Sequence, residues 1–290
     1  MQIRTQDSMK VRKISDYIGA EVTGVDLSKP VDAETKRRLN EALVQNIALV
    51  IKDQTFDGPR QFYDAASQFG EPQARDYSTH SLPELPEVHV ISSHHRNKDG
   101  TVNMTGPRWH TDHANHEFPP KYTMLYAIKL FQTGGGSTGI ANMRAAYDAL
   151  PEATKKRIDA MQTVNVIAGS ASKNVNSDRL AWQKAANPEP VIHPLVRTNP
   201  DTGKKAIYFH PGRVENIVGM TPVDSHKLLD ELVEHALKPQ YIYNHTWSLG
   251  DILIWDNRSA LHKANYDYDP LDTTQERRMF RTLIKGERPH

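Results

Sequence analysis

The residues best suited to chemistry are a short motif, His110-Thr111-Asp112, and a histidine far along the chain, His262. If the motif is extended, successive side chains alternate between two faces, so the His110 imidazole and the Asp112 carboxylate point the same way. A third ligand would complete a set of two histidines and one carboxylate, which leaves three positions of an octahedral metal open. This set is typical of non-haem Fe(II) oxygenases. We therefore predict that His110, Asp112 and His262 bind a ferrous ion.

These histidines could also belong to a zinc site or to a protein without catalytic activity. A zinc cluster of His110, His113 and His116 would need a helix to bring its members together, and Phe118-Pro119-Pro120 would end such a helix at once. The set predicted above also suits Zn(II), so a zinc hydrolase with the same three ligands stays open. A non-catalytic protein that binds a metal or another ligand is a further alternative.

The composition sets limits on the site. The 290 residues carry 36 Lys and Arg against 35 Asp and Glu, so no strong net charge favours nucleic acid or an anionic membrane as a partner. The chain has no cysteine, which leaves nitrogen and oxygen as metal ligands. Residues 1–13 are polar and lack the apolar core of a signal peptide, and no apolar run reaches about 18 residues. We therefore expect a cytoplasmic protein.

The elements that position the site are short strands with a few helices between them. Helices are predicted at about 32–45, 59–68, 142–150 and 223–236, and strands at about 47–51, 88–91, 122–131, 193–197, 206–209, 240–245, 251–256 and 277–284. This pattern leaves the fold class open between α+β and mostly β. No linker divides the chain, so we expect one domain over residues 1–290. Two irregular stretches, about 71–108 and 169–190, are predicted to be lid-like loops over the site.

Several motifs share their order and wording with a known family. They are Gly134-Gly135-Gly136-Ser137-Thr138, the stretch 142–150, the stretch 250–258 and Arg277-Arg278-Met279-Phe280-Arg281. From about Gly19 to about Gly286 the chain resembles the taurine dioxygenase and 2,4-dichlorophenoxyacetate dioxygenase family. The resemblance implies an α+β fold with a double-stranded β-helix, or jelly-roll, surrounded by helices. It also implies Fe(II) as cofactor, 2-oxoglutarate and O2 as cosubstrates, and assembly as a dimer or tetramer.

The same resemblance assigns roles to individual residues. Arg277 matches the arginine that binds the distal carboxylate of 2-oxoglutarate, for which a planar guanidinium is well suited. Thr138 matches the hydroxyl that assists it, although an extra residue in this turn makes Ser137 a competing candidate. On one strand Arg277 and Arg281 share a face, and relatives use the second arginine to bind the prime substrate.

Two histidines are weaker candidates for the substrate site. His80 is the nearest match to a substrate-binding histidine of the family, and His113 follows directly after the metal motif. The implied reaction is hydroxylation of a small anionic substrate, with release of succinate and CO2. A sulfonate, a sulfate ester, an aryloxyalkanoate and another carboxylate all remain open as that substrate.

Overall fold

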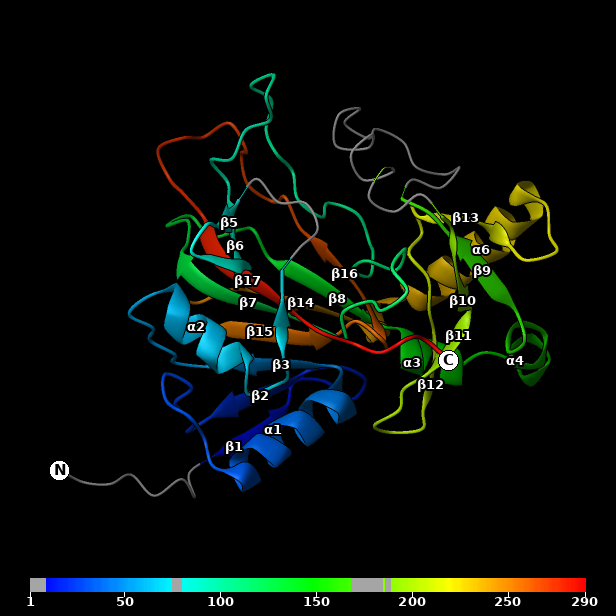
Figure 1. The fold of residues 1–290 in the computed structure, drawn as a ribbon, viewed down its shortest axis with the longest axis horizontal. Coiled ribbons are helices and arrows are strands. Elements are labelled where there is room, and N and C mark those ends of the chain that lie inside the picture. The colour runs from blue at the N-terminus through cyan, green and yellow to red at the C-terminus, as the bar shows by residue number, and fades with distance from the viewer. Residues whose placement is uncertain (1–8, 75–79, 168–184, 186–188) are drawn as a thin grey trace.

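A nine-stranded sheet is the largest layer of the computed structural model, which describes residues 9–74, 80–167, 185 and 189–290 (Figure 1). Its strands follow one another in the order β1 (Lys10–Lys13), β2 (Ala20–Thr23), β3 (Ala48–Ile51), β15 (Ile252–Asp256), β7 (Tyr122–Lys129), β17 (Arg278–Ile284), β6 (Leu85–Ser92) and β5 (Ser81–Leu82). A ninth strand, β4 (Pro72–Gln73), pairs with β17. Neighbours are antiparallel except β2 and β3, which are parallel. The sheet thus joins segments from both ends of the chain.

A second sheet lies against one face of the first. It contains β14 (Ile242–His245), β8 (Thr138–Asn142) and β16 (Ala260–Ala264), with β8 in the centre. One apolar cluster takes Ile140 and Ala260 from this sheet and Leu125, Leu253 and Met279 from the larger one. Burial of such side chains is the main driving force for packing two sheets face to face. The core between the sheets therefore fixes β16 opposite β7 and β17.

Helices cover the other face of the large sheet. A second cluster joins this face to α1 (Ala33–Asn46) and α2 (Pro59–Ala66). Along β15, Ile252 and Ile254 belong to the helix-facing cluster, while Leu253 and Trp255 belong to the cluster between the sheets. A strand that is apolar on both faces is expected where both faces are buried.

The remaining elements pack around β8 and β16. They are α3 (Met143–Asp148), α4 (Glu152–Ile158), α6 (Pro222–Ala236), the 3-10 helix η2 (Pro239–Tyr241), the sheet of β10 (Val191–Pro194), β9 (Gln162–Asn165) and β13 (Val214–Ile217), and the pair β11 (Val196–Thr198) and β12 (Lys205–Ile207). A third apolar cluster joins α3 and α6 to Ala141 of β8 and Leu261 of β16. Figure 1 shows this group beside the large sheet rather than over α1 and α2. Strand β16 is thus held from two sides.

The expected helices are present, and each predicted strand overlaps an observed one. The structure is a mixed α/β fold that is rich in sheet and has few helices. Strand β16, which carries His262, was not predicted. The stretch 71–108 is less irregular than expected because it contains β4, β5 and β6, and most of the stretch 169–190 lies outside the described residues. None of the described helices is long and apolar enough to cross a membrane.

Candidate active site

Two backbone hydrogen bonds hold His110 and His262 directly opposite each other. The His110 amide donates to the His262 carbonyl at 2.9 Å, and the His262 amide donates to the His110 carbonyl at 2.8 Å. The two imidazole rings lie 4.1 Å apart between their centroids. Strand β16 thus brings the distant histidine to the motif, which is where the sequence placed it.

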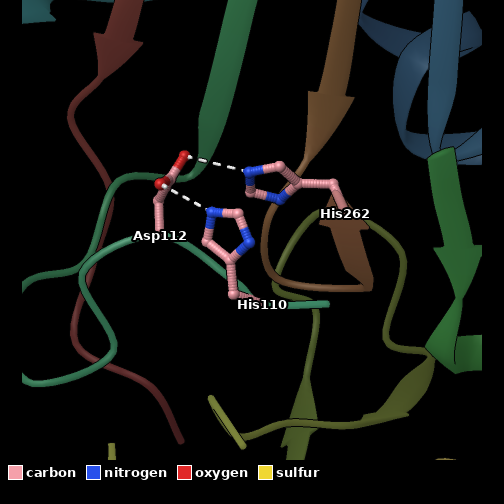
Figure 2. A group of neighbouring side chains, drawn as sticks. All are labelled: His110, Asp112 and His262. Carbon is pink, nitrogen blue, oxygen red and sulfur yellow. Dashed lines mark ion pairs between the residues drawn. The ribbon is translucent and has the colours of Figure 1, made fainter. Parts of the chain in front are cut away.

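Asp112 completes the group. Its Oδ1 lies 3.9 Å from His110 Nε2, and its Oδ2 lies 3.7 Å from His262 Nε2 (Figure 2). Within the part of the chain that the structure describes, these three residues are the only group of histidine, cysteine and acidic side chains close enough to hold a metal ion. His113 and His116 instead contact each other, with 3.3 Å between Nδ1 and Nε2, so the alternative zinc cluster does not form.

The hydrogen bonding of His110 and the burial of both histidines fit a metal site. His110 Nδ1 lies 2.7 Å from the Arg108 carbonyl and donates to it, which leaves the lone pair of Nε2 facing Asp112. The indole N–H of Trp255 donates to Asn257 Oδ1 at 3.1 Å and to His262 Nδ1 at 3.2 Å, so Trp255 contacts the side of the His262 ring that is turned away from Asp112. Burial lowers the pKa of both histidines, and neutral imidazole is the form that binds a metal.

Asp112 is held in its charged form by its neighbours. Arg281 Nη2 and Thr123 Oγ1 each donate to Oδ2 at 2.6 Å. Burial alone would raise the pKa of Asp112, but Arg281 and the two histidines of the group lower it well below its ordinary value. Arg281 therefore lies at the centre, as the strand alternation predicted, but in this structure its partner is Asp112, a candidate metal ligand.

A buried ion pair supports the turn that leads into β16. Asp256 Oδ1 accepts from Arg258 Nε at 2.8 Å, and Asp256 Oδ2 accepts from Arg258 Nη2 and from Asn199 Nδ2, each at 2.9 Å. Both charged side chains are almost completely buried. The turn that they hold lies between Trp255, at the end of β15, and His262.

We expect the Asp256→Ala substitution to lower the free energy of unfolding by about 3–5 kcal/mol, because it leaves the Arg258 guanidinium buried without its main counter-charge. Chemical denaturation monitored by circular dichroism measures this loss. The control is Arg60→Ala, which removes an exposed ion pair with Asp64 and should leave the midpoint unchanged. Equal midpoints for the two variants would show that the buried pair does not stabilise the fold.

The surroundings of Arg277 are suited to binding an anion. Its side chain is buried, its Nε has no hydrogen-bond partner within the described structure, and its Cζ lies 5.8 Å from the centre of the Trp247 ring. Burial lowers its pKa to about 10, which still leaves the guanidinium charged at neutral pH. A buried charge without a counter-ion is costly, so a carboxylate here would be strongly favoured.

The glycine turn makes room for Arg277. Gly136 has φ +69°, and a Cβ on it would come within 2.6 Å of Arg277 Cδ. Next to it, the Ser137 hydroxyl donates to Asp267 at 3.2 Å and accepts from Asn265 at 2.9 Å. The buried Thr138 hydroxyl accepts from the Trp247 indole at 3.1 Å, which leaves its own proton to donate. These contacts favour Thr138 over Ser137 as the partner of an anion bound at Arg277.

Replacing Gly136 with alanine should raise the dissociation constant for 2-oxoglutarate at least about tenfold, since the new Cβ displaces the Arg277 side chain. The matched control is Gly134→Ala. Gly134 also has positive φ, +78°, but nothing lies within 4 Å of its Cβ position. Both variants bear about 1–2 kcal/mol of left-handed strain, so a difference in affinity reports the collision alone. Isothermal titration of the metal-loaded protein measures it, and equal affinities would contradict this role of the turn.

The two histidines predicted at the substrate site have different surroundings. His80 stacks on His95 with 3.6 Å between ring centroids and lies 6.0 Å from His89, which is directly opposite Arg281 in the sheet. His113 follows Asp112 in a left-handed turn with φ 49°. Both remain candidates for substrate contacts.

Four residues near the centre were not predicted: His89, Asn115, His210 and Arg213. The His210 ring lies 5.7 Å from that of His110, and Arg213 Nη1 donates to Asn115 Oδ1. Of the four, only His89 could have been expected from the sequence, because alternation along its strand places its side chain on the same face as that of Arg281, its direct partner on β17. The others come from connections whose paths the sequence does not fix.

Comparisons with known proteins agree over nearly the whole chain. A family model described as taurine catabolism dioxygenase TauD, TfdA family, matches residues 10–283. The chain is 32% identical over 277 residues to an (S)-phenoxypropionate/alpha-ketoglutarate-dioxygenase of Sphingobium herbicidovorans, covering 93% of this chain and 92% of the relative. It is 31% identical over 293 residues to an alpha-ketoglutarate-dependent sulfonate dioxygenase of Saccharomyces cerevisiae, covering 97% and 68%. A crystal structure of a taurine dioxygenase from Burkholderia xenovorans superposes with a TM-score of 0.80 at 29% identity, covering 97% and 91%.

Proposed function

Because the chain belongs to the TauD/TfdA family and is therefore a 2-oxoglutarate-dependent dioxygenase, we propose that it hydroxylates a small anionic organic molecule at a ferrous centre held by His110, Asp112 and His262. The observation that carries the proposal is the convergence of these three side chains on one point. Arg277 supports it, because its side chain is buried and its Nε has no hydrogen-bond partner within the described part of the chain. Alpha-ketoglutarate, or 2-oxoglutarate, appears in the names of both relatives.

The three side chains form a donor set for a ferrous ion in this proposal. The donor set, with nitrogen from His110 and His262 and oxygen from Asp112, suits Fe(II) and leaves three coordination positions for substrates. When bound, a ferrous ion would supply the coupling of O2 reduction to oxidation of 2-oxoglutarate and of a substrate C–H bond. The overall change converts R–H, O2 and 2-oxoglutarate into R–OH, succinate and CO2.

The protein residues bind and orient the reactants. Arg277 would bind the distal carboxylate of 2-oxoglutarate, while the Thr138 hydroxyl would donate a hydrogen bond to the same group. Arg281 keeps Asp112 charged and would lie next to the acidic group of the prime substrate. His80 and His113 would line that site. This positioning lowers the entropic cost of bringing the reactants together, which is the main contribution a protein makes to cofactor chemistry.

We also infer that residues 1–290 form one domain with a jelly-roll core. The packing of β8, β14 and β16 against β7, β15 and β17 supports this assignment. In such a fold the site between the sheets opens at one end, and the segments around residues 71–108 would cover it as a lid. Assembly as a dimer or tetramer remains part of the proposal.

The test is a measurement of succinate release under air with Fe(II), 2-oxoglutarate and a panel of sulfonates, sulfate esters and aryloxyalkanoates. We expect turnover only when all of Fe(II), 2-oxoglutarate and O2 are present, with at least one compound in the panel consumed. Hydrolysis that proceeds with Zn(II) and without O2 would replace the proposal with a zinc hydrolase. Binding of these compounds without any succinate release would replace it with a non-catalytic binding protein.

A further inference from the structure

The segment 265–276, which follows β16 and leads to Arg277, lies against the glycine turn of residues 134–137. Directly after β16, the Asn265 amide donates to the Ser137 carbonyl at 2.9 Å. The Asn265 side chain also donates to the Ser137 hydroxyl at 2.9 Å. The pairing of β16 with β8 is thus continued by this segment along the turn that precedes β8. The proposed function gives the segment no role.

Asp267 connects the segment to the turn. Its Oδ1 accepts a hydrogen bond from the Gly136 amide at 2.5 Å, and its Oδ2 accepts one from the Ser137 hydroxyl at 3.2 Å. A hydrogen bond to an ionised carboxylate is stronger than one between neutral groups. A Cβ on Gly135 would lie 3.0 Å from the Asp267 carbonyl, so the two backbones also approach closely. Asp267 therefore fixes the position of Gly136 relative to the segment.

Gly136 in turn lies directly against Arg277. A Cβ on this glycine would come within 2.6 Å of Cδ and 2.8 Å of Nε of Arg277. Even a small shift of the turn would therefore change the space in which the guanidinium lies. Thr138 follows the same turn, so its hydroxyl would move as well. The hydrogen bond from Gly136 to Asp267 thus acts on both groups that we assign to the distal carboxylate of 2-oxoglutarate.

Two tyrosines bring the same segment close to Arg277. The rings of Tyr266 and Tyr268 lie 5.4 Å apart, and the Tyr266 hydroxyl donates to the Thr105 carbonyl at 3.1 Å. Burial lowers the pKa of Arg277 to about 10. Three groups on the segment, Tyr268, Tyr266 and Asp267, partly oppose this effect, so they lie near the guanidinium. The segment is therefore anchored at the glycine turn and at Thr105, with Arg277 close by.

We propose that Asp267 is a positioning residue of the 2-oxoglutarate site, because it holds the glycine turn and thereby orients Arg277 and Thr138 toward the distal carboxylate. This inference rests on the proposed function and adds a residue to its cosubstrate site. Asp267 is negatively charged and does not itself bind the carboxylate. Its contribution is preorganisation: the turn already has the position that the anion needs, so less order has to be created on binding.

The test compares two substitutions of Asp267 by calorimetric titration of the Mn(II)-loaded protein with 2-oxoglutarate. Asp267→Ala removes both hydrogen bonds and should raise the dissociation constant about tenfold. Asp267→Asn keeps a carbonyl oxygen for the Gly136 amide and should restore most of the wild-type affinity. In steady-state assays with Fe(II), Asp267→Ala should raise the KM for 2-oxoglutarate and leave kcat unchanged. Because Asp267 is exposed, both variants should remain folded, which circular dichroism measures.

A double-mutant cycle tests whether Asp267 acts through Arg277. In the Arg277→Leu background the side chain that the turn orients is absent, so Asp267→Ala should weaken 2-oxoglutarate binding much less than it does in wild type. The same factor in both backgrounds would mean that the two residues act independently, and this would overturn the inference.

The matched control is Asp272→Ala, on the same segment. Its Oδ1 accepts from the Thr274 amide at 2.8 Å and from the Thr274 hydroxyl at 2.6 Å, so this substitution also removes two hydrogen bonds. It should leave the 2-oxoglutarate affinity unchanged. If wild type binds 2-oxoglutarate, then wild-type affinity in Asp267→Ala, or an equal loss in Asp272→Ala, rejects the role of Asp267 alone. A wild-type protein that does not bind 2-oxoglutarate rejects the proposed function as well.

Discussion

The His110→Ala variant should lose its 2-oxoglutarate-dependent succinate release by at least about 1,000-fold. Substitution of groups that merely orient metal ligands costs about 10–100-fold in affinity or activity, so removal of a ligand should cost more. His110 would provide one of the three protein donor atoms found within the described residues, and its Nε2 faces Asp112 because Nδ1 donates to the Arg108 carbonyl. The variant should also bind Fe(II) more weakly, which equilibrium dialysis measures without any need for turnover.

His116→Ala is the matched control for this prediction. His116 lies on the same loop, six residues after His110, but contacts His113 rather than the candidate metal site. It should keep wild-type metal affinity, and both variants should show the far-ultraviolet circular dichroism of the native fold. Equal loss of metal affinity in the two variants would mean that the loop, and not the ligand, determines binding.

In the Arg277→Leu variant, the dissociation constant for 2-oxoglutarate should rise about 100-fold, which corresponds to about 2.7 kcal/mol. Loss of one partner from a buried pair of opposite charges commonly costs about 2–5 kcal/mol. The Arg277 guanidinium is buried against Trp247, and its Nε lacks a partner in the described structure, so bound 2-oxoglutarate would supply its counter-charge. Calorimetric titration of the protein loaded with Mn(II) in place of Fe(II) measures this affinity in the absence of turnover.

The neighbouring arginine provides the control. Arg278 points to the opposite side of β17, is exposed, and pairs with Glu276 at 2.9 Å. Arg278→Leu should leave the 2-oxoglutarate affinity unchanged. An unchanged affinity in Arg277→Leu as well would refute the assignment of the distal carboxylate to this residue.

The metal site could be predicted from the sequence because its chemistry depends on residue type and on alternation over very few residues. Within the motif, only His110 lies in a β-bridge. The Asp112 carboxylate still points to the same place as the His110 imidazole, because the left-handed turn at His113 begins only after Asp112. His262 was identified although its strand was not. The five residues of β16 lack a clear period, and their pairing with β8 is a contact between segments far apart in the chain.

The environment of the arginines could not be predicted in the same way. Alternation placed Arg281 on the site face of β17, but whether its guanidinium would contact a substrate or Asp112 depends on the distance across the sheets. Arg213 gave no signal at all, because it lies in the turn before β13 and reaches Asn115 only through tertiary packing. Alternation thus predicted the face of Arg281, which lies on a regular strand, and it gave no indication of Arg213, which lies on a connection.

The most direct test of the central claim is an anaerobic titration of the wild-type apoprotein with Fe(II) and then 2-oxoglutarate, followed in the visible spectrum. We predict the weak charge-transfer band of a chelate between the metal and 2-oxoglutarate, saturating at one equivalent of each. The band should be absent from His110→Ala and should need a much higher 2-oxoglutarate concentration in Arg277→Leu. A wild-type protein that is well folded, binds Fe(II) and develops no band would contradict the assignment of this site to 2-oxoglutarate-dependent chemistry.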